Sequence, residues 1–209
     1  MRTPILESAA RLFARLGYAG TSVQAIADSV GIKKPSLIYW FPSKQALRDA
    51  VVEDLLSRWN QVLPKVMVAA TGGEDRFQRT LTEVLGFFRE DPDRARLLMR
   101  EILDHPDEMR RHLEVTLRPW LALVTEYIRL GQRHRQVRPE LDPEAWTIEI
   151  TILAIGTIAS TGVFDQVVGG DDADAFAQRQ VDELLRMAHA SLFLDRPTNG
   201  VADDTKESP

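Results

Sequence analysis

Apolar residues recur three and four positions apart along nearly the whole of this 209-residue chain. That spacing places them on one face of a helix, whereas a half-buried strand has an apolar residue at every second position. The few clusters of β-branched residues lie inside longer helical patterns. The sequence therefore predicts an all-α fold of about nine helices, without a β-sheet.

Glycine and proline residues divide this pattern into segments. The predicted helices are residues 3–16, 22–30, 35–40, 43–69, 75–90, 93–103, 106–135, 143–167 and 172–194. Pro119 lies inside the seventh of them. Because proline lacks a backbone donor, it should kink this helix or start a new one after Leu117. Residues 195–209 are polar without an apolar period, so we expect a disordered tail there.

Charge is distributed unevenly along the chain. Residues 1–50 carry seven Lys and Arg against three Asp and Glu, a net charge of +4, which leaves −9 on the remainder of a chain whose total is −5. A basic region joined to an acidic one is typical of a nucleic-acid-binding part attached to a part with another role. We therefore predict one domain at residues 1–50 and a larger one at residues 51–194.

Composition excludes several classes of site. The chain has no cysteine, so it has neither a disulfide scaffold nor a thiolate metal site nor a thiol nucleophile. Its four histidines do not follow a metal-binding spacing, and no glycine-rich phosphate loop or nucleophile elbow is present. We expect no metal, no cofactor and no enzymatic activity. Without an apolar run of membrane-spanning length or a signal peptide, we expect a cytoplasmic protein with no membrane partner.

The basic region contains two short predicted helices joined by a glycine turn. Thr21 and Gln24 have the spacing of a capping box that starts the first helix. Gly31 supplies the left-handed residue that ends this helix. In the second helix, Leu37 and Phe41 are four positions apart and should face the first helix, which leaves lysines and hydroxyls outside. This arrangement predicts a helix-turn-helix suited to the major groove, although an ordinary amphipathic helix pair with solvated lysines has the same periodicity.

A longer match favours the first interpretation. The stretch from Ile5 to Ala27, followed by Gly31-Ile32 and then by Leu37 to Leu47, resembles the DNA-binding domain of the TetR family of transcriptional regulators. This resemblance covers residues 5–51. It implies a homodimeric regulator, most often a repressor, that binds operator DNA and is released from it by a small apolar or amphipathic effector. The alternatives are a helical interaction module with degenerate DNA binding and a small-molecule enzyme on a helical scaffold.

The resemblance also implies DNA contacts, position by position. The residues matching base-facing positions are Gln24, Lys34, Pro35, Ser36 and Ile38. The predicted phosphate contacts are Thr21, Ser22, Lys33, Tyr39, Trp40 and Lys44, with Lys33 contributing through its charge. Gln24 can pair with adenine, Lys34 can donate to guanine, and Ile38 can contact a thymine methyl. The family usually has tyrosine at the position of Ile38 and histidine at that of Trp40, so the operator sequence is left open.

For the acidic region, the resemblance implies a helical domain for ligand binding and dimerisation. Aromatic and aliphatic residues of the middle helices form the predicted ligand pocket: Trp59, Phe87, Phe88, Met99, Leu103, Trp120, Val124, Tyr127 and Trp146. Three of these, Trp120, Tyr127 and Trp146, carry a polar edge that a ligand can satisfy.

The last two predicted helices each carry an apolar stripe. The resemblance implies that these two helices form a four-helix dimer interface, and the stripes fit that expectation. The predicted interface residues are Ile152, Ile155, Gly156, Ala159, Val163, Leu184, Leu185, Ala188 and Leu192. The alternative is that both stripes are buried within one monomer.

Overall fold

The computed structural model of the protein describes residues 1–71, 76–164, 167–168 and 172–194. It contains ten helices: α1 (Arg2–Gly20), α2 (Val23–Ser29), α3 (Lys34–Trp40), α4 (Lys44–Thr71), α5 (Arg76–Arg89), α6 (Pro92–Asp104), α7 (Pro106–Thr116), α8 (Arg118–Arg133), α9 (Pro143–Ala159) and α10 (Ala173–Leu192). The described residues form no sheet, and their single β-type pairing is an isolated bridge between Val137 and Phe193. The all-α prediction is confirmed. The predicted tail lies outside the described residues.

Two helix boundaries test the sequence pattern most directly. The predicted break at Pro119 is confirmed, because α7 ends at Thr116 and α8 begins at Arg118, which raises the number of helices from nine to ten. The predicted extension of α9 to residue 167 is wrong, since α9 ends at Ala159. Gly162 follows with a left-handed φ of 84°. Apolar residues continue beyond this glycine, so the sequence pattern continues where the helix does not.

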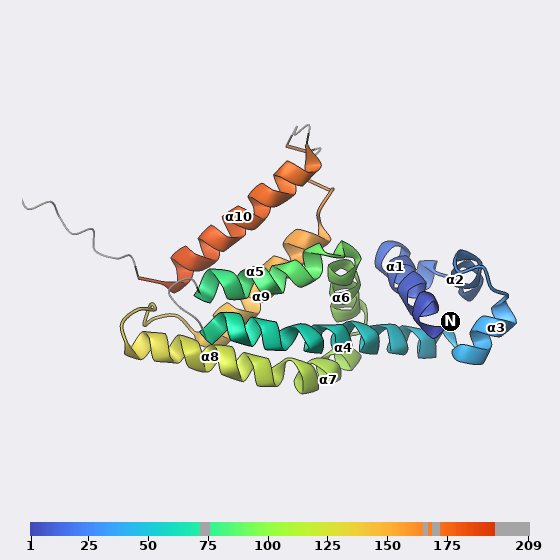
Figure 1. Ribbon diagram of the computed structural model, residues 1–209, viewed down its shortest axis with the longest axis horizontal. Coiled ribbons are helices and arrows are strands. Elements are labelled where there is room, and N and C mark those ends of the chain that lie inside the picture. Colours follow the sequence, from blue (N-terminus) through green and yellow to red (C-terminus); the bar gives the residue numbers. More distant parts are fainter. Residues whose placement is uncertain (72–75, 165–166, 169–171, 195–209) are drawn as a thin grey trace, which may run out of the picture.

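The first three helices form a small unit at one end of the molecule, from which α4 extends along the remaining helices (Figure 1). We refer to α1–α3 as the head and to α4–α10 as the body. Phe13, Ile26 and Leu37 meet inside the head and are at most 1% exposed. Gly31 adopts the predicted left-handed turn, with φ 70°. Leu37 and Phe41 are both buried, so the inward face predicted for α3 is confirmed.

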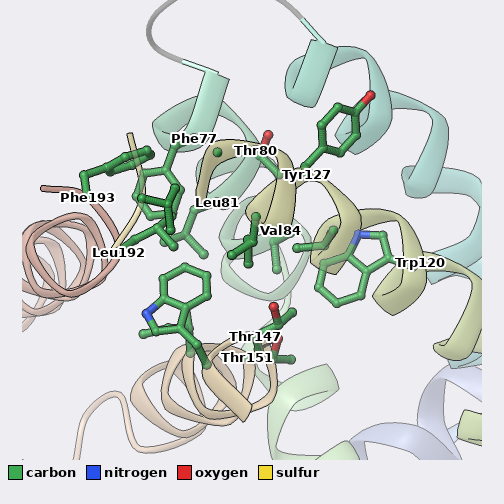
Figure 2. A pocket seen from close by; sticks show the side chains of 16 residues that line it. Phe77, Thr80, Leu81, Val84, Trp120, Tyr127, Thr147, Thr151, Leu192 and Phe193 are labelled. Carbon is green, nitrogen blue, oxygen red and sulfur yellow. Dashed lines mark hydrogen bonds between the residues drawn. The ribbon is translucent and has the colours of Figure 1, made fainter. Parts of the chain in front are cut away.

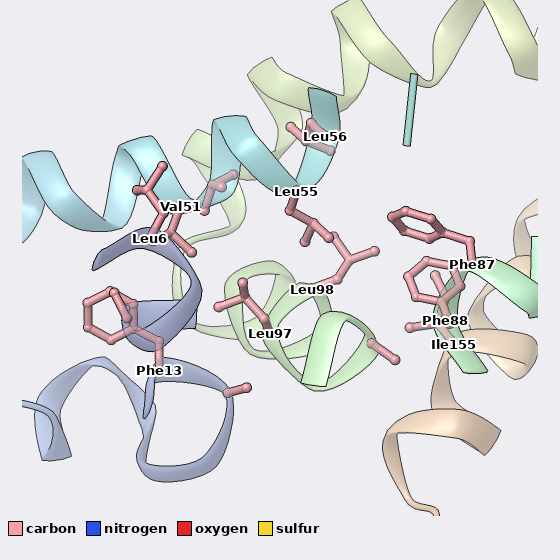
Figure 3. Close-up of a cluster of buried hydrophobic side chains, with 14 of the residues drawn as sticks. Leu6, Phe13, Val51, Leu55, Leu56, Phe87, Phe88, Leu97, Leu98 and Ile155 are labelled. Atoms are coloured by element: carbon pink, nitrogen blue, oxygen red, sulfur yellow. The ribbon is translucent and has the colours of Figure 1, made fainter. Parts of the chain in front are cut away.

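Helix α6 connects the head with the interior of the body. It packs against α1 on the head side and against α9 on the other. Leu6 and Phe13 of α1 belong to the same buried cluster as Leu97 and Leu98 of α6 and Ile155 of α9 (Figure 3). The apolar core is therefore continuous from the head into the body. The proposed domain boundary at residue 50 lies within the unbroken helix α4.

None of the described helices combines the length and the apolar character needed to cross a membrane.

Candidate DNA-binding face and ligand cavities

Helix α2 begins one residue later than the capping-box pattern predicts. Its N-cap is Ser22, whose hydroxyl accepts a hydrogen bond from the Ala25 amide at 3.0 Å. Thr21 is 1% exposed, and its hydroxyl donates to the Gly17 carbonyl at 2.8 Å. The predicted phosphate contact of the Thr21 side chain is therefore wrong, because this buried hydroxyl is bonded to carbonyls of α1. The Gln24 amide, predicted to reach back to the cap, donates forward to Asp28 at 2.6 Å.

The five predicted base contacts are all exposed. They are Gln24 on α2 and Lys34, Pro35, Ser36 and Ile38 on α3. Pro35 stands in the first turn of α3, where its missing amide costs no helical hydrogen bond. Leu37 is the one buried residue of this helix. Because its other side chains face solvent, α3 can enter a major groove without giving up its packing in the core.

Among the predicted phosphate contacts, Ser22, Lys33, Tyr39 and Trp40 are exposed. Tyr39 is 86% exposed, and its ring meets that of Trp40 edge-on, with centroids 6.0 Å apart. Lys44 is half-buried at the start of α4, with its Nζ 4.2 Å from the centroid of the Tyr18 ring. A cation held over an aromatic ring is restrained in direction, so the position of this ammonium depends on Tyr18.

The body contains two apolar cavities, both partly open to solvent. The larger has a volume of about 630 Å³ and is lined by side chains of α4 to α9. Four predicted pocket residues, Trp59, Phe87, Phe88 and Trp120, line it, and the ring centroids of Trp59 and Phe87 are 5.3 Å apart. Its charged residues, Arg110, Glu114 and Arg118, are all exposed. Apolar walls with charged groups only at exposed positions suit a ligand with a large apolar portion.

The smaller cavity, of about 130 Å³, contains the other predicted aromatic residues. Tyr127 and Trp146 line it together with Val124 and Trp120, and Figure 2 shows Phe77 and Phe193 on its opposite side from Trp120. Val84, Trp120 and Thr151 line both cavities. The two cavities are therefore neighbours with a shared wall.

Two predicted pocket residues, Met99 and Leu103, line neither cavity. Leu103 is 72% exposed, and Met99 packs against the core. Helix α6 contributes Leu98 and Ile102 to the larger cavity instead. These two residues are four positions apart, and the next residue in each case is turned about 100° away around the helix. The prediction therefore has the correct helix and the wrong face.

Sequence reasoning also missed aliphatic wall residues on α4 and α7. They are Leu55, Leu56, Met109 and Leu113. Their signal was the helical period itself, which does not distinguish a cavity wall from a packed core.

The polar edges of two predicted pocket residues have different environments. The Trp146 indole donates to the Ser191 hydroxyl at 2.9 Å. The Trp120 indole N–H is buried and has no hydrogen-bond partner among the described residues. Buried donors in proteins normally have a hydrogen-bond acceptor, so the Trp120 indole N–H is a donor beside the cavities that a ligand could satisfy.

Much of the predicted dimer interface is buried within the single chain. Leu184, Ala188 and Leu192 of α10 are each at most 4% exposed, and α10 packs against α9 and α5. Ile155 is buried as well and lines the larger cavity. For these four residues the prediction of a dimer contact is wrong, because they contribute to the core of their own chain. Gly156, Ala159 and Leu185 are half-buried.

Other apolar residues of the same region do face solvent. Ile152 and Val163, which belong to the predicted interface, are exposed, and their contact with a second subunit stays a prediction. Further exposed residues lie on α9, on the segment after it and on α10: Leu153, Phe164, Val167, Val168 and Met187. Exposed apolar residues on two helices that pack together are a feature of protein–protein contacts.

The described part of the chain contains no group of three His, Asp or Glu residues placed to hold a metal ion.

Comparison with known proteins matches both parts of the chain. A family model described as bacterial regulatory proteins of the tetR family matches residues 5–51, and one described as the tetracyclin repressor-like C-terminal domain matches residues 74–188. The transcriptional regulator RutR of Escherichia coli K12 is 30% identical over 134 residues, a match that spans 61% of this chain and only 62% of RutR.

Two further proteins are similar over different lengths. IcaR of Staphylococcus aureus (strain Newman), named as a negative transcriptional regulator of the icaADBC biofilm operon, is 38% identical over 63 residues, which cover 30% of this chain and 34% of IcaR. The structure of KstR2, described as a ketosteroid transcriptional regulator of Mycobacterium tuberculosis, has a TM-score of 0.70 at 18% identity and covers 93% of this chain and 95% of KstR2. The structural match extends from the head through the body. At 18% identity it shows a shared fold and nothing about the ligand.

Proposed function

Because the chain belongs to the TetR family of bacterial regulatory proteins, we propose that it is a homodimeric repressor. Membership of this family makes it a transcriptional regulator with a DNA-binding and a ligand-binding domain. In this proposal it binds a pseudo-palindromic operator through its two α3 helices and leaves it when a small apolar or amphipathic effector occupies the body. The observation that carries the proposal is a filled head with a polar outer face, joined to a body with an apolar cavity of about 630 Å³.

The outer side chains of α2 and α3 support the DNA part of the proposal. Gln24 and Lys34 present hydrogen-bonding groups suited to adenine and guanine, and Ile38 presents an apolar group suited to a thymine methyl. Lys44 is proposed to contact a phosphate. The two α3 helices of a dimer would read half-sites about 34–36 Å apart, one turn of the duplex.

The exposed apolar residues of α9, the following segment and α10 support a homodimer. In a two-fold dimer the same patch serves on both subunits, so Ile152, Val163 and Phe164 would be covered by their counterparts. Release from DNA then follows from geometry. An effector that binds better to a conformation with another head separation weakens DNA binding by that difference in affinity.

A pair of lysines on α4 tests the DNA proposal. Lys44→Ala should weaken binding to every duplex sequence and lower the slope of log K against log salt concentration by about 0.9 for each phosphate that is no longer neutralised. Lys65→Ala removes an exposed lysine from the distant part of the same helix and should change neither quantity. Fluorescence anisotropy over a salt series measures both. Equal effects of the two substitutions, or a wild-type protein that does not bind duplex DNA, would overturn the proposal.

Base reading and direction of control need separate measurements. Gln24→Ala should relax the sequence preference of binding and keep the salt slope.

A promoter–reporter fusion carrying the selected operator should be expressed more strongly when the protein is absent, as IcaR's description as a negative regulator suggests for this chain. Weaker expression in its absence would identify an activator instead.

A further inference from the structure

An ionic cluster around a buried arginine lies between the head and the body, outside both the DNA-binding face and the cavities. Arg48 of α4 is 3% exposed. Its guanidinium lies 3.3 Å from the Glu101 carboxylate and forms an ion pair with Glu108. A carboxylate oxygen of Asp49 lies 3.8 Å from a nitrogen of the same guanidinium. A buried guanidinium is stable only with such partners, so Arg48 ties α4 to the end of α6 and the start of α7.

The ring of Tyr18 completes this cluster on the head side. Lys44 Nζ lies over it at 4.2 Å, and the Arg48 guanidinium is 5.7 Å from its centroid. His105, between α6 and α7, meets the same ring edge-on at 5.9 Å. Tyr18 is therefore in contact both with the proposed phosphate-binding lysine and with the corner between α6 and α7.

The other face of that corner belongs to the larger cavity. Ile102 of α6, with Pro106 and Met109 of α7, lines the cavity, while Glu101 and Glu108 of the same turns hold Arg48. A molecule that enters the cavity at this wall therefore contacts the turns of helix that fix Arg48. Arg48 and Lys44 are four residues apart and lie on one side of α4.

We propose that Arg48 and Tyr18 are positioning residues, which hold the Lys44 ammonium for contact with a DNA phosphate and make its position depend on the corner between α6 and α7. The inference rests on the proposed function, because it takes Lys44 to be a phosphate contact. When the corner moves, Glu101, His105 and Glu108 move with it. Arg48 and the Tyr18 ring follow, and the ammonium shifts relative to the phosphate.

A double-mutant cycle separates positioning from ordinary stabilisation. Arg48→Met keeps the apolar stem and removes the charge. It should weaken binding to a duplex spanning two successive major grooves by about threefold to tenfold, and this effect should nearly vanish in a Lys44→Ala background. A residue that only stabilises the fold weakens binding equally in both backgrounds. Arg58→Met is the matched control, since Arg58 lies on α4 and pairs with Asp54 at 2.7 Å away from the cluster.

Two milder substitutions keep the test informative if Arg48→Met does not fold. Glu108→Gln removes one partner of the guanidinium, and His105→Leu removes the ring that contacts Tyr18. Each should give the same dependence on Lys44, with thermal melts confirming that the protein is folded. Additive effects throughout, with Lys44→Ala itself still weakening binding, would overturn the inference and leave the proposed function intact. A Lys44→Ala protein that binds like the wild type would refute the phosphate contact itself.

The cavity side of the corner needs its own comparison. Ile102→Trp adds bulk beside the corner and should weaken binding to the same duplex about threefold or more, with little effect in the Lys44→Ala background. Ile148→Trp adds equal bulk from α9 to the same cavity and should change binding less. Equal effects of the two substitutions would show that the corner has no special link to Lys44.

Discussion

The head and the body differ in how completely their interiors are packed. In the head, Phe13, Ile26 and Leu37 fill the interior, and the residues with a proposed function face outward. In the body, the helices leave about 630 Å³ unfilled, and the proposed ligand-contacting residues line this space. A DNA-reading unit must hold side chains at fixed spacing, which a filled core does, whereas a ligand site needs apolar volume. The charges differ in the same way, since residues 1–50, with a net charge of +4, can approach phosphates that the −9 remainder of the chain repels.

The largest expected effect compares one substitution in the two regions. Leu37→Ala empties a site that is 0% exposed and should lower the free energy of unfolding by about 2–5 kcal/mol. Leu113→Ala removes a half-buried residue from the wall of an existing cavity and should cost less, because this side chain has fewer packed neighbours to begin with. Urea denaturation measures both. If the two costs are equal, the contrast between a filled head and an unfilled body is wrong.

A smaller effect is expected from exchanging threonine for valine, which keeps the shape and removes the hydroxyl. Thr21→Val removes a buried hydroxyl that lies within hydrogen-bonding distance of the Leu12 and Gly17 carbonyls of α1 and should cost about 1–3 kcal/mol. Thr151→Val removes a hydroxyl that donates only to the preceding turn of its own helix, at the wall of both cavities. That change should stay within about 0.5 kcal/mol. A larger cost for Thr151→Val in calorimetric unfolding would contradict the apolar character of the cavities.

The smallest effect concerns the junction between head and body. Burial raises the pKa of Glu101, while Arg48 and His105 oppose that shift. The folded state therefore holds the Glu101 proton more tightly than the unfolded chain, and the free energy of unfolding contributed by this group falls as the pH rises from 4.5 through the raised pKa. Stability of the wild type relative to Glu101→Gln should decline over that range.

A surface carboxylate provides the control of opposite sign. A hydrogen bond from Arg186 lowers the pKa of Glu183, so its contribution is present above the ordinary pKa and disappears as the pH falls. Stability of the wild type relative to Glu183→Gln should therefore decline on acidification. Denaturant titrations at a series of pH values measure both differences, and the same sign for both would contradict the burial of Glu101 at the junction.

Local features were the predictable ones. The break at Pro119, the turn at Gly31 and the inward face of α3 follow from backbone chemistry and helical period, which act over a few residues. The errors have a common origin. The predictions for Leu103 and Leu184 rest on composition and period, and each residue lies on the other side of its helix from the surface predicted for it. A period identifies an apolar face and says nothing about which neighbour will cover it.

The amino-acid sequence alone specifies the all-α fold, the helix-turn-helix, the basic head and the family. Tertiary packing settles which face of α10 turns inward, where the cavities lie, and that Arg48 meets Glu101 and Glu108. The physical reason is the range of the interactions. Helix formation and turns depend on residues a few positions apart, whereas a cavity or a buried ion pair depends on how helices distant in sequence pack together.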